Sequence, residues 1–184
     1  MADPVAASTL ESLRSALRSQ YHAGLAMLRD AIAQCPPSQW DATPHPNQFW
    51  QIAYHALFFT HLYAQQDEKS FRPWSGHQTD NQNPDGLAGP PTPDSPLPLI
   101  PRPYSRVQVL EYWTICDEAI DGWIDALNLT AVESGFPWVS MPKLEHQLVN
   151  LRHLQHHTAQ LADRLRVASN VGVRWVNRGR STSH

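Results

Sequence analysis

The sequence predicts an all-α protein: an antiparallel four-helix bundle with a long Pro-rich crossover loop between the second and third helices. Four stretches carry apolar residues at every third or fourth position, which is the helical period. No stretch alternates apolar and polar residues for long enough to form a strand. At 184 residues, with 41% hydrophobic and 17% charged residues, the chain fits one globular domain. We therefore expect a single domain over 1–184, with its core over about 8–168.

The first two helices differ in how much of their surface is apolar. The first is predicted over about 7–34, where Pro36 and Pro37 stop it, and its apolar positions are Leu10, Leu13, Leu17, Tyr21, Leu25, Leu28 and Ile32. The second is predicted over about 47–66 and is apolar nearly all round. That pattern is typical of a buried helix.

A long loop follows the second predicted helix. Residues 67–103 are dense in proline, which prevents a helix and indicates a lid, a binding loop or disorder. We expect this loop to lie over the bundle. Ser105 followed by Gln108 predicts a capping box at the start of the third helix. The fourth helix starts near Pro142, with Asn170 and Gly172 as stops, and a polar tail follows over about 170–184.

Composition excludes several function classes. The net charge of −3 gives no strong field for nucleic acid or an anionic membrane. No apolar run approaches the roughly 20 residues of a membrane span, and the N-terminus lacks a signal-peptide pattern. The two cysteines, Cys35 and Cys116, are too few for a disulfide framework and are predicted to be inert buried thiols. We expect a cytoplasmic protein without nucleic-acid or membrane partners.

A pair of histidines on the fourth helix points to metal binding. In RHLQHHTAQL, His153 and His157 are four residues apart, so both imidazoles can reach one ion, while His156 faces another direction. They belong to a polar stripe that consists mainly of His, Asn and Gln rather than Lys and Glu: His146, Asn150, His153, His157, Gln160 and Arg164. This composition favours an enclosed cleft, although a solvated histidine face remains the alternative.

His55, in the apolar second helix, supplies the third ligand if its helix row faces that stripe; the alternative is a core histidine. Three protein ligands leave an open position, as in catalytic sites. The cofactor would be one divalent transition metal, zinc or nickel foremost, with iron, manganese or copper also accepted. Three residues on the same rows could orient a further ligand: Gln51, Asn150 and Gln160.

Other titratable residues are assigned structural or surface positions. His22 is predicted to be structural and His61 to lie at a rim. Asp117, Glu118, Asp121 and Asp125 form an acidic face on the third helix, which is typical of a solvent-exposed surface. A closed metal site, with Asp121, Glu118 or His61 as a fourth ligand, is the competing arrangement.

Two segments, HPNQFWQIAYHALFFTHLY and SMPKLEHQLVNLRHLQHHTAQLADRL, resemble the DinB/YfiT superfamily of metalloproteins. The resemblance covers about residues 8–168 and implies an antiparallel four-helix bundle with a metal held by His55, His153 and His157. It also implies a small-molecule substrate and, in some members, a low-molecular-weight thiol such as bacillithiol or mycothiol. The Pro-rich insert at about 67–103 departs from the family pattern.

Three functions stay open from the sequence. The first is a metal-dependent thiol S-transferase-like enzyme or hydrolase. The second is a non-catalytic metal- or ligand-binding bundle of the stress response. The third is a metal-free interaction module with structural histidines. The sequence identifies neither the substrate nor the metal, and it leaves open whether the chain forms a homodimer.

Overall fold

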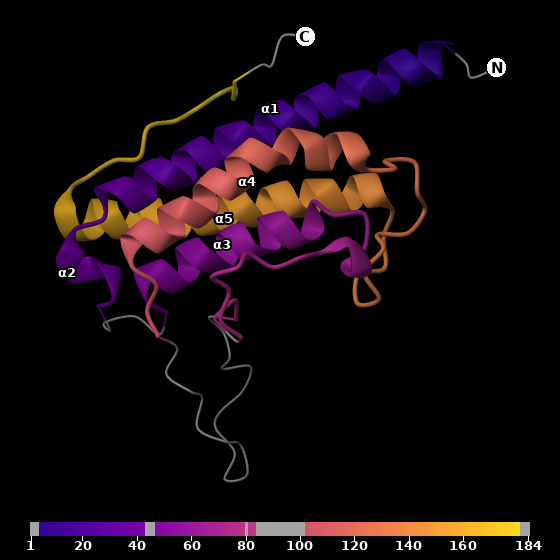
Figure 1. Ribbon diagram of the computed structural model, residues 1–184. Helices are drawn as coiled ribbons and strands as arrows, with labels where there is room; N and C mark the ends of the chain where they lie inside the picture. Colours follow the sequence, from indigo (N-terminus) through magenta and orange to yellow (C-terminus); the bar gives the residue numbers. More distant parts are fainter. Residues whose placement is uncertain (1–3, 43–46, 80, 84–101, 181–184) are drawn as a thin grey trace.

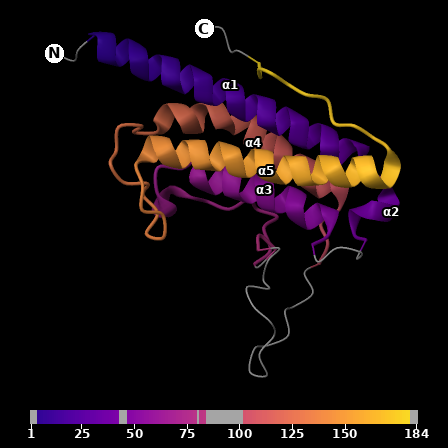
Figure 2. The same ribbon diagram turned by 180° about the vertical axis from the view of Figure 1, so that it is seen from behind.

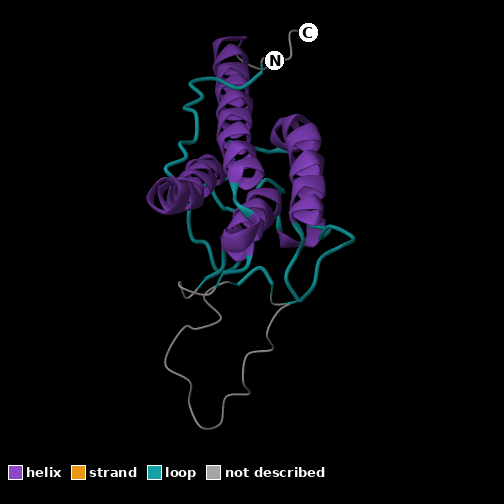
Figure 3. Cartoon of the chain, turned by 90° about the vertical axis from the view of Figure 1, so that its left-hand side faces the viewer, coloured by secondary structure: helices purple, strands orange, loops and turns teal. Residues whose placement is uncertain are grey.

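The computed structural model describes residues 4–42, 47–79, 81–83 and 102–180, and within these the chain forms helices and no strand (Figure 3). The all-α prediction is therefore confirmed for this part of the chain. Four long helices lie side by side in Figure 1: α1 (Pro4–Gln34), α3 (Phe49–Tyr63), α4 (Arg106–Ala126) and α5 (Lys143–Ser169). Two short elements were not predicted from sequence: α2 (Pro37–Trp40) and a 3-10 turn, η1 (Glu68–Ser70).

Local sequence signals set the helix ends. Ser105 and Gln108 form the predicted capping box at the start of α4. Asn170 ends α5 in the left-handed conformation, with φ of 54°, as its position after the last apolar residue indicated. A second capping box, formed by Gln48 and Gln51, makes α3 begin later than predicted.

Helices α3 and α5 run antiparallel and bring their polar residues together. Contacts join the two helices in an order that rises along α5 as it falls along α3: Gln147 donates to Tyr63, Asn150 donates to Thr60, and the Nε2 atoms of His153 and His55 lie 2.9 Å apart. This register places the middle of α3 opposite the polar stripe of α5.

Helices α1 and α4 are also antiparallel, because Trp113 donates to the carbonyl of Leu25 while Arg14 donates to that of Leu127. Figure 1 shows α3 and α4 running in the same direction. The chain must therefore return along the length of α3, about 22 Å for its 15 residues, before α4 begins. This return explains why the connection between them cannot be a tight turn.

The core lies between the four long helices and is closed by the first part of the connecting loop. The largest side chains below 2% exposure include Trp50, Tyr54, Tyr104 and Tyr112. Trp74, from the loop, stacks on Tyr112 with ring centroids 5.1 Å apart. The predicted packing of the loop on the bundle thus holds around Trp74, whereas residues 84–101 lie outside the described part.

Both cysteines are buried, as predicted, at 1% and 0% exposure. Burial raises the pKa of Cys35 to about 11, and it raises that of Cys116 further, so neither thiol is a ready nucleophile.

The C-terminal segment, residues 171–180, turns back along α1 (Figures 1 and 2). The backbone N–H of Gly179 donates to the carbonyl of Ser19, and that of Arg174 donates to the Asp30 carboxylate. The sequence predicted only a polar tail here. None of the described helices combines the length and the apolar character that a membrane crossing requires.

Candidate metal centre

Three histidines from two helices converge between α3 and α5. His153 and His157 project from successive turns of α5, and His55 meets them from α3. The Nε2 atom of His153 lies 2.9 Å from that of His55 and 3.0 Å from that of His157. One ring nitrogen from each residue lies within 4.8 Å of the other two, and all three side chains are partly buried.

Outer contacts determine which nitrogen of His55 and His157 faces the cluster. The Nδ1 atom of His55 is 2.6 Å from the carbonyl oxygen of Gln82, which can only accept, so Nδ1 carries the proton. The Nδ1 atom of His157 lies 2.8 Å from Oε1 of Gln160 and donates in the same way. In the neutral rings, the Nε2 lone pairs of both residues therefore point into the cluster.

His153 occupies the middle of the cluster. Burial, reinforced by His157 and His55, lowers the pKa of His153 to about 3, so its imidazole is neutral near neutral pH. Its Nδ1 atom is buried without a hydrogen-bond partner, and its ring packs edge-on against Phe59 at 5.5 Å. On its Nδ1 side, therefore, no hydrogen bond holds this ring, and packing against Phe59 orients it there.

The facing nitrogens of the cluster offer more lone pairs than protons, which suits a bound cation. A neutral His153 can place at most one proton on Nε2, yet two inward-facing lone pairs lie about 3 Å from that atom. At least one of these close contacts is therefore not a hydrogen bond between neutral rings. Nitrogens bound tetrahedrally to one zinc ion at about 2.1 Å lie roughly 3.4 Å apart. The two separations at His153 are about 0.5 Å shorter than that value, and all three nitrogens lie within 4.8 Å of one another, so the residues present fit a divalent ion after a small shift.

The three residues predicted to surround the ligands make different contacts, and only one of them touches the cluster. Gln160 contacts His157, as described above. Gln51 instead accepts from the backbone N–H of Gln48 and caps α3. Asn150 is buried and donates to the Thr60 carbonyl, which ties α5 to α3.

The prediction that His61 lies at a rim is wrong. It is only 7% exposed, its ring stacks on Trp123 at 4.3 Å, and its Nδ1 lies 3.0 Å from the Tyr112 hydroxyl. Both partners come from α4, so a projection of the second helix alone could not reveal them. Burial lowers the pKa of His61 to about 4.

The acidic residues considered as fourth ligands lie on another face. Asp121 contacts His22 of α1 at 2.9 Å, and Glu118 borders a cleft between α1 and α4. His156 is exposed, with its ring 5.0 Å from that of His157, and does not belong to the cluster.

Two contributors were missed by sequence reasoning. The Gln82 carbonyl is a backbone group within the loop, and no side-chain pattern signals it. Phe59 lies one turn after His55 and packs on it at 4.7 Å, a neighbour that the spacing of four could have indicated.

Comparison of the chain with protein-family models, with curated proteins and with solved structures finds no match.

Proposed function

We propose that the chain binds one divalent transition metal, zinc or nickel foremost, through His55, His153 and His157. We further propose that it is a metal-dependent transferase or hydrolase of the DinB/YfiT type, built as an antiparallel four-helix bundle. The observation that carries this proposal is the convergence of three ring nitrogens, with the lone pairs of His55 and His157 directed inward by Gln82 and Gln160.

The residues around the cluster have separate roles in this proposal. A divalent ion held by three neutral imidazoles supplies Lewis-acid chemistry and lowers the pKa of a water or thiol that completes its coordination. Gln82 and Gln160 orient two ligands and increase the basicity of their inner nitrogens. Phe59 covers the His55 and His153 rings on one side with an apolar surface, which limits the access of water from that side.

The composition of the cluster supports an open coordination position. Within the described part of the chain, the group contains three histidines and neither a carboxylate nor a thiolate. Three neutral ligands leave the charge of a divalent ion uncompensated, which favours an anionic exogenous ligand such as a thiolate. We accordingly propose a small-molecule substrate and a low-molecular-weight thiol as partners. A non-catalytic metal-binding bundle would share the site but show no turnover.

Cobalt substitution tests whether the three histidines bind a metal ion and whether that ion accepts a further ligand. Titrating the metal-free protein with Co²⁺ should give a visible absorption band that saturates at one ion per chain. His55→Ala, His153→Ala and His157→Ala should each abolish the band, whereas the matched His156→Ala variant should retain it.

Adding a small thiol to the cobalt protein should then shift the band. An unchanged spectrum at saturating thiol would mean a closed coordination sphere and would contradict the enzyme proposal. Retention of the full band in His55→Ala would contradict the three-histidine site itself.

A further inference from the structure

The first part of the long loop returns along α3 (Figure 1). Its described residues 74–79 and 81–83 are called the anchored segment below. Near the end of this segment, the backbone carbonyl oxygen of Gln82 lies 2.6 Å from Nδ1 of His55. The carbonyl of Gln82 therefore connects the loop to a histidine of the candidate metal centre.

Helix residues outside the metal centre hold the rest of the anchored segment. The hydroxyl of Tyr54 lies 2.6 Å from Nδ1 of His77. The hydroxyl of Tyr104 accepts from the backbone N–H of Gln78 at 2.7 Å and donates to the carbonyl of Gly76 at 2.9 Å. These contacts dock the segment on the bundle a few residues before the carbonyl that faces the metal centre.

A neutral His55 carries one ring proton, and two neighbours compete for it. A proton on Nδ1 is donated to the Gln82 carbonyl, and the Nε2 lone pair then faces Nε2 of His153 at 2.9 Å. A proton on Nε2 can be donated to His153, but the Nδ1 lone pair then faces the carbonyl oxygen, and two acceptors repel each other. Because the ring is neutral in both forms, the loop contact depends on the tautomer of His55 and not on its charge.

Metal binding would decide this competition in favour of the loop. When Nε2 of His55 uses its lone pair for an ion, only Nδ1 can hold the proton, and it then donates toward Gln82. The ion also draws electron density from the ring, which makes the Nδ1–H group a stronger donor. A loop contact that is stronger in the metal-bound protein must raise the affinity for the metal by the same factor.

We propose, on the basis of the metal centre proposed above, that metal binding locks the anchored segment against α3 through the contact between His55 and Gln82. The docked segment in turn tightens metal binding. The anchored segment is then the part of the chain that responds to metal occupancy.

Hydrogen exchange of the full chain with and without zinc tests this coupling. The backbone N–H groups of His77, Gln78 and Asn81 report the docking, since each donates within the segment or to Tyr104. Zinc should slow exchange in peptides that span 74–83 by about fivefold or more, the lower end of typical couplings between sites. The zinc content is determined on the same samples.

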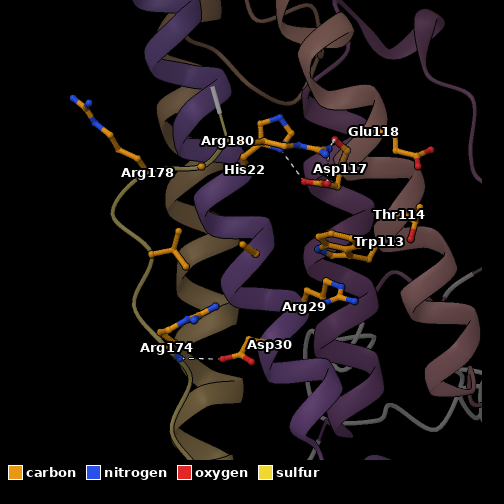
Figure 4. Close-up of a pocket in the computed structure, with 13 residues that line it drawn as sticks. His22, Arg29, Asp30, Trp113, Thr114, Asp117, Glu118, Arg174, Arg178 and Arg180 are labelled. Carbon is orange, nitrogen blue, oxygen red and sulfur yellow. Dashed lines mark hydrogen bonds and ion pairs between the residues drawn. The ribbon is translucent and has the colours of Figure 1, made fainter. Parts of the chain in front are cut away.

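The C-terminal segment, residues 171–180, is the internal control because it docks on α1 and α4. Figure 4 shows Arg174 joined to Asp30 of α1 and Arg180 beside Asp117 of α4. Zinc should leave its exchange unchanged. An equal slowing in this segment would mean that zinc stabilises the whole fold, and it would contradict a specific effect on the loop.

Tyr104→Phe tests the coupling from the side of the loop. The substitution keeps an aromatic ring in the core but removes both hydroxyl contacts to the anchored segment. Zinc affinity, measured by competition with a chelator, should fall by a factor that does not exceed the slowing of exchange by zinc in the wild type. Tyr21→Phe is the matched control, because it removes a buried hydroxyl contact to Gln147 outside the segment and should leave zinc affinity unchanged.

Nitrogen NMR of labelled histidine side chains reads the tautomer of His55. With zinc bound, the proton should lie on Nδ1 alone, whereas in the metal-free protein part of the population should carry it on Nε2. A proton on Nδ1 alone in both states would overturn the proposed route of coupling, because the cluster and the loop would not compete.

The outcomes separate this proposal from the proposed function. Zinc bound at one ion per chain with unchanged exchange in 74–83 would overturn the coupling and leave the metal centre intact. The absence of zinc binding would contradict the metal centre and the coupling together. A Tyr104→Phe variant whose anchored segment exchanges faster, but whose zinc affinity equals that of the wild type, would also overturn the coupling.

Discussion

Acid should destabilise the protein in a way that depends on His61, because this side chain is buried in its neutral form. Its pKa is about 4 in the folded protein, against an ordinary value of 6.5. Between these values the unfolded chain binds a proton more readily than the folded chain. The stabilising contribution of neutral His61 is therefore complete above pH 6.5 and is lost as the pH falls toward 4.

The size of this effect follows from the two pKa values. At about pH 5 the unfolded histidine is almost fully protonated, while the folded one is protonated in about one molecule in ten. The linkage relation then gives a loss of about 2 kcal/mol in the free energy of unfolding relative to pH 8. His61→Phe keeps an aromatic ring against Trp123 and removes the titration. The same substitution leaves the Tyr112 hydroxyl without its partner, which costs about 1–3 kcal/mol at every pH.

Urea unfolding measures the difference. The free energy of unfolding is determined near pH 8 and pH 5, with a chelator present so that metal release does not contribute. Wild-type protein should lose about 2 kcal/mol more than His61→Phe over this interval. His156→Phe, which alters an exposed histidine, should behave like the wild type. Equal pH dependence in the wild type and His61→Phe would refute the reasoning.

Two further predictions concern the core and the C-terminal segment. Leu161→Ala, at a position with 0% exposure, should lower the free energy of unfolding by about 2–5 kcal/mol in urea, whereas Leu148→Ala, at 56% exposure, should cost well under about 1 kcal/mol. Similar losses at both positions would contradict the assigned burial of α5. A Cβ on Gly179 would lie 2.2 Å from the His22 Cβ and 2.7 Å from the Ser19 carbonyl, so Gly179→Ala should detach the C-terminal segment and speed its removal by limited proteolysis. Gly172→Ala, where nothing lies within 4 Å, is the matched control, and equal cleavage rates in the two variants would contradict the docking.

The helices and two of the three histidines of the candidate metal centre could be predicted because their signals are local. A helical period fixes which residues share a face, so His153 and His157 could be paired from spacing alone. The Ser105 capping box and the Asn170 stop are equally local, and the structure contains both. The placement of His55 required an assumption about which faces of two helices meet, and the α3–α5 register supplies that pairing.

Features that depend on contacts between distant elements could not be predicted from the same patterns. The rim position predicted for His61 was wrong because its partners belong to α4, and a projection of the second helix alone does not include them. Gln51 shares a helix row with His55, but its side chain is used by the cap of its own helix. Gly179 lies in a segment without periodicity, so nothing in its surroundings indicated close contact with α1.

The metal content of the purified, untagged protein tests the central claim most directly. Elemental analysis should find about one divalent transition metal ion per chain in the wild type and in His156→Ala. His153→Ala, which removes the nitrogen lying between the other two, should contain almost none. A wild-type protein that stays metal-free after incubation with zinc or nickel, or a His153→Ala variant that keeps a full equivalent, would contradict the account.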